Sequence, residues 1–422
     1  MYILRYKKTI VFSLIIIMVV WFLQPIYSFY AHKDKLPLPF WGWHQLPEKN
    51  PLSEKLYGTR FTKAAQKSLH LIDNHKNTIH SPAISVAVAI DNKLVWAAAT
   101  GWQDITGKKP ITINSRFRIG STSKAINSIA LARLVDAGKI NLDHTVDHYI
   151  KPLPNPAWQY ITPRMLASHS SGLPHYKENT DLFGLYKTIT LSTAYESMID
   201  ALEIFDSAQL LSQPGSQFSY STLGTVLLGA VMESVEQKSY FKLVDDLVFE
   251  PLNITDVIIA PTTSTDGTNI ATSYKRDNRN HQPNLVRKWR PVDLSHRLPG
   301  GGFAATSSDL VKLASAFIDT DFISLNTQQL FLQPQRLADG KVNAQNYAIG
   351  WRIANTSIGH HELVMHANHG GVSRGAQSWL MVLPKYRMAV AVNINSNVEH
   401  FWDFAKISMD IAEAFLDQLN LD

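Results

Sequence analysis

The chain has 422 residues, of which 45% are hydrophobic, so it can bury a sizeable core in one large α/β domain or in two or three smaller ones. It contains no cysteine, which excludes disulfides, thiolate nucleophiles and cysteine-ligated zinc. The formal net charge of +5 arises at the N-terminus: residues 1–35 hold five Lys/Arg and one Asp, which leaves 35 basic and 34 acidic side chains. We therefore expect no nucleic-acid partner.

The N-terminal segment, residues 1–31, predicts a membrane anchor. Arg5, Lys7 and Lys8 precede an uncharged, largely apolar run from Thr9 to Ala31. About 20 apolar residues span a bilayer, and basic residues stay on the cytoplasmic side. We expect a single-pass protein of the inner (cytoplasmic) membrane with the rest of the chain in the periplasm or exterior. A cleaved signal peptide is the alternative, although the bulky segment 27–30 offers no small-x-small cleavage site.

The rest of the chain predicts an α/β (α+β) fold. Residues 32–57, rich in Pro and Trp, are expected to form an extended linker, and 58–422 one large domain. Strands are expected over 83–90 and 93–101, joined by a turn at Asp91-Asn92, and over 347–353, 377–383 and 388–393. Helices are expected over 61–79, 121–138, 191–211, 223–249, 310–318 and 398–419, with a long polar loop over 261–289.

Strands thus occur early and late, with helices between them. This order favours one sheet assembled from both ends of the chain, about 58–120 and 340–422, and an inserted, mostly helical part over about 121–339.

The segment 117–124, Phe-Arg-Ile-Gly-Ser-Thr-Ser-Lys, carries the first candidate catalytic groups. An extended approach, a glycine bend and an apolar helix put Ser121 at a helix N-terminus, where free N–H groups favour an alkoxide or oxyanion. Lys124 follows one turn later on the same face. Its apolar surroundings predict a desolvated amine with a lowered pKa that can accept the serine proton. The alternative is a helix-capping serine beside a solvated lysine.

Ser239-Tyr240-Phe241-Lys242 has the same Ser-x-x-Lys spacing, so the spacing alone has little weight. Ser239 is expected inside the helix that reads as continuous from residue 223, whereas Ser121 stands where a strand meets a helix. This context favours Ser121. The cluster 168–172, His-Ser-Ser-Gly with its flanking serine, is read as helix-ending turn chemistry.

Two further segments carry candidate groups. Tyr220 lies between a turn and a helix, where a phenol beside an ammonium could shuttle protons; a structural tyrosine is the alternative. His369-Gly370-Gly371 precedes the expected strand 377–383, and its glycines permit close approach of a substrate. The neighbouring His360, His361 and His366 suggest a metal, but His361-Glu362 followed by His366 misses the H-E-x-x-H spacing by one residue. We expect no metal and no cofactor.

Ser121-x-x-Lys124, Tyr220-Ser221-Thr222 and His369-Gly370-Gly371 together resemble, in order and approximate spacing, the motifs of the penicillin-recognising serine hydrolases, in particular the class C β-lactamase-related branch. The resemblance implies an antiparallel sheet flanked by helices, a nucleophile at Ser121 and a proton-handling pair of Lys124 and Tyr220. It implies an oxyanion hole made by the backbone N–H groups of Ser121 and Val372. It also implies substrate contacts by Thr222, His369, Gly370 and Gly371.

Two positions depart from the family pattern. Thr222 stands where the family usually has Asn, and His369 stands where true β-lactamases have Lys. A histidine is mostly neutral near pH 7, so efficient β-lactam hydrolysis is not expected. We expect an exported serine hydrolase that cleaves an ester or amide of a small-molecule or peptide substrate through an acyl-enzyme. The alternative is a binding module of the same fold that holds a cell-wall peptide or a protein partner without turnover.

Overall fold

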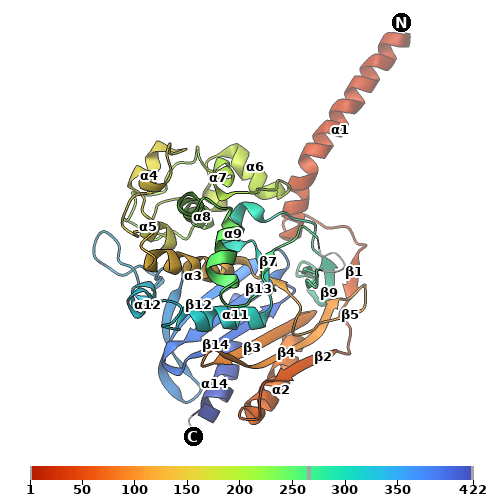
Figure 1. Ribbon diagram of the computed structural model, residues 1–422. Helices are drawn as coiled ribbons and strands as arrows, with labels where there is room; N and C mark the ends of the chain where they lie inside the picture. Colours follow the sequence, from red (N-terminus) through yellow and green to blue (C-terminus); the bar gives the residue numbers. More distant parts are fainter. Residues whose placement is uncertain (1, 264–267, 420–422) are drawn as a thin grey trace.

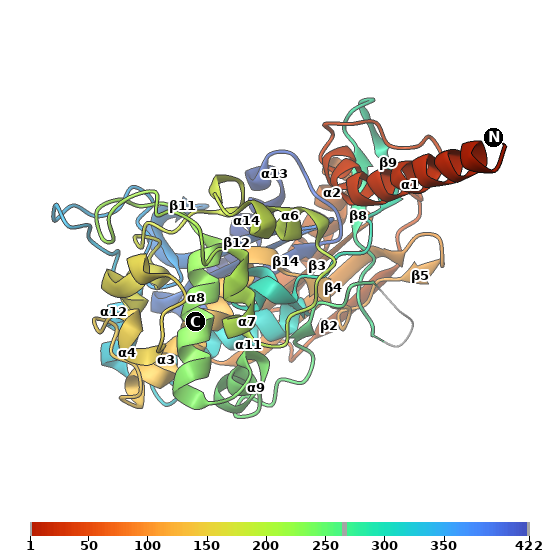
Figure 2. The same cartoon turned by 90° about the horizontal axis from the view of Figure 1, so that it is seen from above.

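A computed structural model describes residues 2–263 and 268–419 (Figures 1 and 2). Met1, residues 264–267 of the expected loop 261–289, and the end of the chain from 420 lie outside the described residues. The body of the molecule is an antiparallel sheet in the order β11-β12-β13-β14-β3-β4-β2, with β5 on β4. Its strands come from both ends of the chain, as expected: β2 (Leu52–Leu56), β3 (Ala83–Ile90), β4 (Lys93–Asp104), β5 (Lys109–Pro110), β11 (Arg352–Ile358), β12 (His361–Ser373), β13 (Ala376–Leu383) and β14 (Met388–Ile394).

The two central strands explain how the sheet is covered. β3 alternates large and small side chains, so Val86 and Val88 face one side while Ala87 and Ala89 face the other. The large side packs against α2 (Thr62–Thr78) and α14 (Ile407–Leu419). The small side receives α11 (Ser307–Phe317). Asp91 and Asn92, with φ of 49° and 59°, form the expected turn between β3 and β4.

The helical part lies above the small-residue side of the sheet (Figure 1). Its central helices are α3 (Ser123–Asp136) and α8 (Thr222–Glu236), which share a core with α11. Around them lie short elements: α4 (Val146–Tyr149), α5 (Pro163–Ala167), α6 (Leu182–Thr190), α7 (Met198–Ala201), α9 (Tyr240–Val244), a π turn Asp245–Phe249, α10 (Leu298–Gly301) and α12 (Leu325–Leu332).

Two long helices expected from the sequence are wrong. The helix over 191–211 is absent: Leu191, with φ of 53°, ends α6, and only α7 and a 3-10 turn follow. The helix over 223–249 is interrupted after Gln237, also left-handed with φ of 53°. The carboxylate of buried Glu233 accepts the backbone N–H of Tyr240 at 2.7 Å and so caps the start of α9. This contact lies within the run itself and, together with the left-handed Gln237, divides a segment that periodicity alone would join.

The expected linker contains pairing segments. β2 pairs with β4 and forms the edge of the sheet, and β1 (Trp43–Gln45) pairs with β9 (Gln282–Lys288). β9 in turn pairs with β8 (Tyr274–Asp277), so part of the expected loop 261–289 is a hairpin. Ahead of these strands, α1 (Tyr2–His32) projects from the body of the molecule in Figure 1. A third, short sheet joins β6 (Phe117–Arg118), β10 (Phe303–Ala305) and β7 (Ile258–Ile259).

The largest error in the strand assignment concerns β12. Its sequence is rich in His, Asn and Gly, so no strand was expected there, yet it has 13 residues and pairs with β11 and β13. His369-Gly370-Gly371 therefore lie within a strand instead of before one. The strand expected over 347–353 begins only at Arg352, because Gly350, with φ of 78°, turns the chain against α3. The expected C-terminal helix is present as α13 (Phe401–Ala405) and α14.

Candidate active site

Ser121 lies in a 3-10 turn, Gly120–Thr122, between β6 and α3. The turn needs glycine at 120 for two reasons: its φ is 51°, and a Cβ there would lie 2.7 Å from the backbone of Val372. A Cβ on Gly371 would lie 1.9 Å from the carbonyl oxygen of Ile119. The two glycines let this turn press directly against β12. The backbone groups of Ser121 and Val372, which are expected to form an oxyanion hole, are thereby brought to the same edge of the cavity described below.

Lys124 is buried in the first turn of α3, with 2% of its surface exposed. Its Nζ lies 3.4 Å from Ser121 Oγ, 3.1 Å from Thr222 Oγ1 and 2.8 Å from the carbonyl oxygen of Gly300. Burial lowers the pKa of the Lys124 amine well below its usual value of 10.5, and the charges of Arg297 and Arg352 lower it further. No carboxylate among the described residues forms an ion pair with it.

This environment fits a neutral amine. A neutral lysine has two N–H donors and one lone pair. The carbonyl oxygen of Gly300 can only accept, so it takes one N–H, and Thr222 Oγ1 takes the other. The lone pair then remains for the hydroxyl proton of Ser121. The structure thus places a buried lysine beside the serine, as the sequence leads us to expect.

Tyr220 lies across the site from Lys124, with its ring centroid 4.9 Å from the lysine Nζ. Its pKa shift is opposite to the one expected from the sequence. Burial raises the pKa of Tyr220 to about 12, although a hydrogen bond with Ser121 and the charge of Arg352 lower it in part. An ammonium at Lys124 would have lowered it, but a neutral amine does not. Tyr220 therefore retains its proton and can donate it.

The turn 168–170 supports Tyr220 from below. His169 is buried, with φ of 61°; its Nδ1 accepts the backbone N–H of Ser221 at 3.2 Å, and its ring centroid lies 4.3 Å from that of Tyr220. Burial lowers the pKa of His169 well below its usual value, so the ring is neutral. The sequence predicts the turn but gives no sign of this packing role, because His169 and Tyr220 are 51 positions apart.

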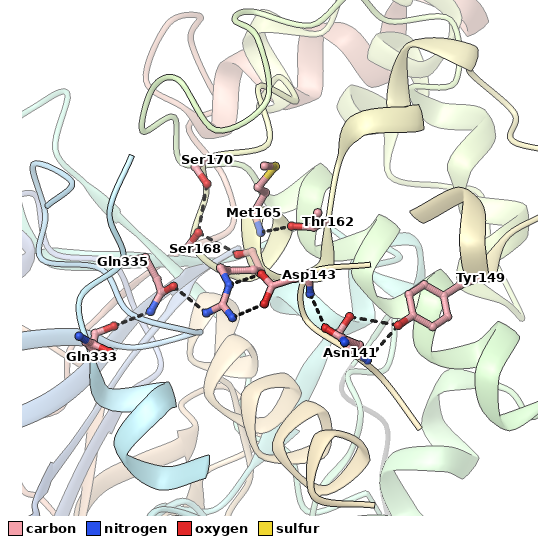
Figure 3. Close-up of polar contacts among 10 residues, drawn as sticks. Asn141, Asp143, Tyr149, Thr162, Met165, Ser168, Ser170, Gln333 and Gln335 are labelled. Atoms are coloured by element: carbon pink, nitrogen blue, oxygen red, sulfur yellow. Dashed lines mark hydrogen bonds and ion pairs between the residues drawn. The ribbon is translucent and has the colours of Figure 1, made fainter. Parts of the chain in front are cut away.

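A polar network holds this turn in place (Figure 3). Both nitrogens of the Arg164 fork donate to Asp143, at 2.6 and 2.8 Å, and a third donates to Gln335 at 3.1 Å. Ser168 donates its hydroxyl to the carbonyl oxygen of Arg164, and its Oγ lies 3.2 Å from that of Ser170. The loop after α3, helix α5 and the segment before β11 are thus joined beneath the turn.

His369 occupies a different place from the one its motif suggests. Its side chain is fully buried and is not among the residues that line the cavity beside Ser121. Its Nδ1 lies 2.8 Å from the carbonyl oxygen of Gly370, which can only accept, so Nδ1 carries the proton and Nε2 accepts the hydroxyl of Tyr347 at 2.8 Å. Burial also lowers the pKa of His369 well below its usual value. Val372, by contrast, is 57% exposed and lines the cavity.

Ser121 opens into a cavity of about 490 Å³. Thr222, Gly300 and Gly301 form its floor near Lys124, and the sequence analysis missed most of the remaining lining. These residues are Phe29, Tyr30, Lys33, Lys35, His175, Tyr176, Lys177, Leu185, Thr188, Ile189, Arg297 and Arg374, together with Gly120 and Val372. The missed residues come from α1, α6 and several loops, so local sequence offers no signal that they converge.

The histidines considered for a metal lie elsewhere. His360 and His361 have ligand atoms within 4.8 Å of each other and of Asp417, near the end of α14. His366 is not part of this group; its ring contacts Thr356 and Asn368. None of the three lines the cavity beside Ser121.

Comparison with known proteins agrees with the fold. A family model described as Beta-lactamase matches residues 70–412. The chain belongs to the Beta-lactamase family. Human mitochondrial serine beta-lactamase-like protein LACTB is 27% identical, over 77% of this chain and 73% of LACTB. Among solved structures, the D-amino acid amidase from Ochrobactrum anthropi SV3 superposes with a TM-score of 0.67 at 19% identity, over 85% of this chain and 99% of the amidase.

The octameric penicillin-binding protein homologue from Pyrococcus abyssi superposes with a TM-score of 0.66 at 20% identity, over 83% of this chain and 77% of the homologue. At such identities the two superpositions show the fold alone. They agree with the β-lactamase/transpeptidase-like architecture of a large antiparallel sheet and flanking helices. The Beta-lactamase family also includes hydrolases that act through a serine, and the amidase is named for D-amino acid amides.

Proposed function

We propose that this protein is an exported serine hydrolase that cleaves an ester or amide through an acyl-enzyme on Ser121. The observation that carries the proposal is the buried amine of Lys124, whose Nζ lies 3.4 Å from Ser121 Oγ and whose pKa burial lowers well below 10.5. A structural lysine would gain from a carboxylate partner or from solvent. A buried amine whose lone pair faces a serine hydroxyl is arranged for proton transfer.

The steps follow from these positions. Lys124 Nζ takes the hydroxyl proton of Ser121 as Oγ forms a bond to the substrate carbonyl carbon. The backbone N–H groups of Ser121 and Val372 stabilise the oxyanion. The bond to the leaving alcohol or amine then breaks, and the leaving group takes a proton from Tyr220, which Lys124 replenishes. Water attacks the acyl-enzyme by the same route in reverse and releases the acid.

Ester or D-amino-acid amide substrates are favoured over β-lactams. Thr222 has no side-chain amide with which to hold a substrate. Its hydroxyl accepts a hydrogen bond from Lys124, and the residue is only 3% exposed. His369 supplies no fixed positive charge at the position of the usual lysine, because its ring is buried and neutral. The likeness in fold to a D-amino acid amidase supports an amide of this kind as one substrate to try.

We also propose that α1 anchors the protein in the membrane. Its segment Thr9–His32 is 24 residues long and contains an 18-residue window with a mean hydropathy of 2.4, enough to cross a bilayer. A signal sequence has the same composition. Retention is supported by the lining of the cavity, to which Phe29 and Tyr30 of α1 contribute. The basic residues at positions 5, 7 and 8, which precede this segment within α1, support a domain in the periplasm or exterior.

The test is covalent labelling of the full chain in detergent with a fluorophosphonate, followed by intact-mass analysis. We expect a single adduct on Ser121, lost in Ser121→Ala. An adduct that survives Ser121→Ala, or no adduct at all, would contradict the mechanism and favour a binding module. Turnover of a p-nitrophenyl ester and of a D-alanyl amide then distinguishes an esterase from an amidase.

A further inference from the structure

The active-site cavity has one wall that belongs to the N-terminal helix. Phe29 and Tyr30 of α1, with Lys33 just beyond it, line the same cavity as Ser121. Phe29 ties this wall to the turn between β12 and β13: Arg374 Cζ lies 5.3 Å from its ring centroid, and Lys33 Nζ lies 4.6 Å from the same ring. The cavity is therefore incomplete without the end of the segment proposed to cross the membrane.

Helix α6 forms the adjoining wall and lies beside α1 (Figure 1). The ring of Tyr186 stacks on Phe22 at a centroid distance of 4.8 Å. Phe22 precedes the end of α1 at His32 by ten residues, which is about 15 Å of helix. With α1 across a bilayer, α6 reaches the level of the hydrocarbon.

Side chains on α6 are suited to that position. Leu182 and Phe183 are 79% and 66% exposed, which is costly in water and favourable in the membrane interface. Leu185 and Ile189 of the same helix line the cavity. The apolar wall formed by Phe29, Tyr30, Leu185 and Ile189 runs from the proposed bilayer toward Ser121. We call it the α1–α6 wall.

The cavity is also strongly basic, and two of its cations, Lys33 and Arg374, lie against Phe29 of this wall. Its charged lining residues are Lys33, Lys35, Lys177, Arg297 and Arg374, and none of the described lining residues carries a carboxylate. Arg297 is only 7% exposed, and the Nε atoms of Arg297 and Arg374 have no hydrogen-bond partner among the described residues. Burial and the neighbouring positive charges lower the pKa of Lys33 to about 8 and that of Arg374 to about 9. Arg297 is buried and Arg374 is half-buried, and neighbouring cations of this kind are stabilised by a bound anion.

We propose that the substrate is an anionic amphiphile taken from the membrane surface, with its charged group at Arg297 and Arg374 and its hydrocarbon chain along the α1–α6 wall. The ester or amide carbonyl then lies beside Ser121, between the two ends of the site. This inference rests on the hydrolase function proposed above, whose substrate class it names. It also explains why a catalytic cavity would be built against a membrane anchor.

The test uses the full chain in nanodiscs of phosphatidylcholine and measures how fast a fluorophosphonate labels Ser121. Three competitors are compared: dodecyl phosphate, dodecylphosphocholine with the same chain, and ethyl phosphate without one. We expect dodecyl phosphate to slow labelling about tenfold more effectively than dodecylphosphocholine at equal mole fraction, as one or two charge-assisted hydrogen bonds would give. Ethyl phosphate should give no protection at the same total concentration.

Variants locate the effect. Arg297→Gln and Arg374→Gln should each reduce the preference for dodecyl phosphate, whereas Lys242→Gln, which removes an exposed cation away from the cavity, should leave it unchanged. Leu182→Ser/Phe183→Ser should weaken protection by dodecyl phosphate without altering labelling in its absence. These two side chains do not line the cavity, so this variant tests the membrane contact alone.

Each other outcome overturns the inference. Equal protection by ethyl phosphate would indicate a soluble anion, and equal protection by dodecylphosphocholine would indicate an apolar ligand. If Ser121 is never labelled, the hydrolase proposal fails. Binding is then judged by the thermal unfolding of Ser121→Ala in the same nanodiscs, where a rise in Tm with dodecyl phosphate but not with dodecylphosphocholine would still support the site.

Discussion

The two Ser-x-x-Lys segments have the same spacing but opposite surroundings. Both serines lie at the start of a helix, because Ser239 precedes α9 in place of the helix interior expected for it. Lys124 is buried and has its pKa lowered by burial, whereas the Lys242 side chain is 57% exposed and has its pKa raised by a hydrogen bond with Asp246. What distinguishes a base from a surface cation is thus the set of groups packed around the amine.

The groups packed around the Lys124 amine come from distant parts of the chain. The carbonyl oxygen of Gly300 and the hydroxyl of Thr222 contact Lys124 Nζ, while Lys242 contacts acidic groups on its own short helical segment. A lysine paired with a carboxylate stays protonated and cannot accept a proton. The predictions below test this difference, beginning with the largest effect.

The first prediction concerns the removal of each serine in turn. Ser121→Ala should abolish fluorophosphonate labelling, because Ser121 Oγ lies 3.4 Å from the buried amine of Lys124, while Ser239→Ala should label as the parent does. Intact mass measures both. Equal loss in the two variants would mean that the segments are not as different as their surroundings suggest.

The second prediction removes the amines. Lys124→Ala should slow labelling by roughly 10²–10⁴-fold, the usual contribution of a general base. Lys242→Ala should change it by less than about twofold, because that ammonium lies in solvent. The far-UV spectrum of each variant serves as a check on folding. A Lys124→Ala enzyme that labels at the parental rate would exclude this amine as the base.

The third prediction concerns the contact that closes over Lys124. A Cβ on Gly300 would lie 2.6 Å from Thr222 Cγ2 and 3.3 Å from Lys124 Nζ, so Gly300→Ala must displace one of them. A displacement near 1 Å at a reacting group costs roughly 10²-fold in rate. Gly107→Ala is the matched control, since its Cβ would meet nothing closer than 3.6 Å. A parental labelling rate for Gly300→Ala would show that the fit over the amine is looser than described.

The fourth prediction follows from the sign of the pKa shift. Only neutral Lys124 accepts a proton, so labelling should fall about tenfold per pH unit once the pH drops below its lowered pKa. Between that pKa and the usual 10.5, the unfolded state binds one more proton than the folded state, so this residue lowers stability progressively as the pH falls through the window. Lys124→Met should remove this dependence, measured by urea unfolding at several pH values. An unchanged slope would mean that the lysine is charged in the folded protein.

The smallest effect is expected from the polar network that holds the turn 168–170 beneath Tyr220. Arg164→Ala removes the fork to Asp143, whose side chain is 65% exposed, so we expect a loss of at most about 1 kcal/mol in stability. Backbone bonds also hold the turn: the N–H of Ser219 donates to the carbonyl oxygen of His169 at 2.8 Å. Labelling should fall by less than about threefold. Lys341→Ala, at a surface pair with Asp339, is the control.

Local sequence predicted those parts of the fold that local forces determine. The hairpin at Asp91-Asn92 and the cap at Thr306, whose side chain accepts the N–H of Asp309, are short-range features with distinctive residues. β12 escaped prediction because its buried polar side chains, among them His366 and His369, are acceptable only once partners from β11 and the segment before it are in place. The helix over 223–249 was wrong for a similar reason, since a buried carboxylate divides it.

The sequence by itself determined the family, the apolar N-terminal helix and the three motif segments, which carry Ser121 with Lys124, Tyr220 and His369, because spacing along the chain is enough to identify them. Only the tertiary structure decided what those groups are. Burial lowers the pKa of Lys124 and raises that of Tyr220, and the side chain of His369 lies buried away from the cavity. Arg297, Arg374 and the end of α1 meet at Ser121 only in space. A charge state depends on everything packed within a few ångströms of the group, and most of that comes from elsewhere in the chain.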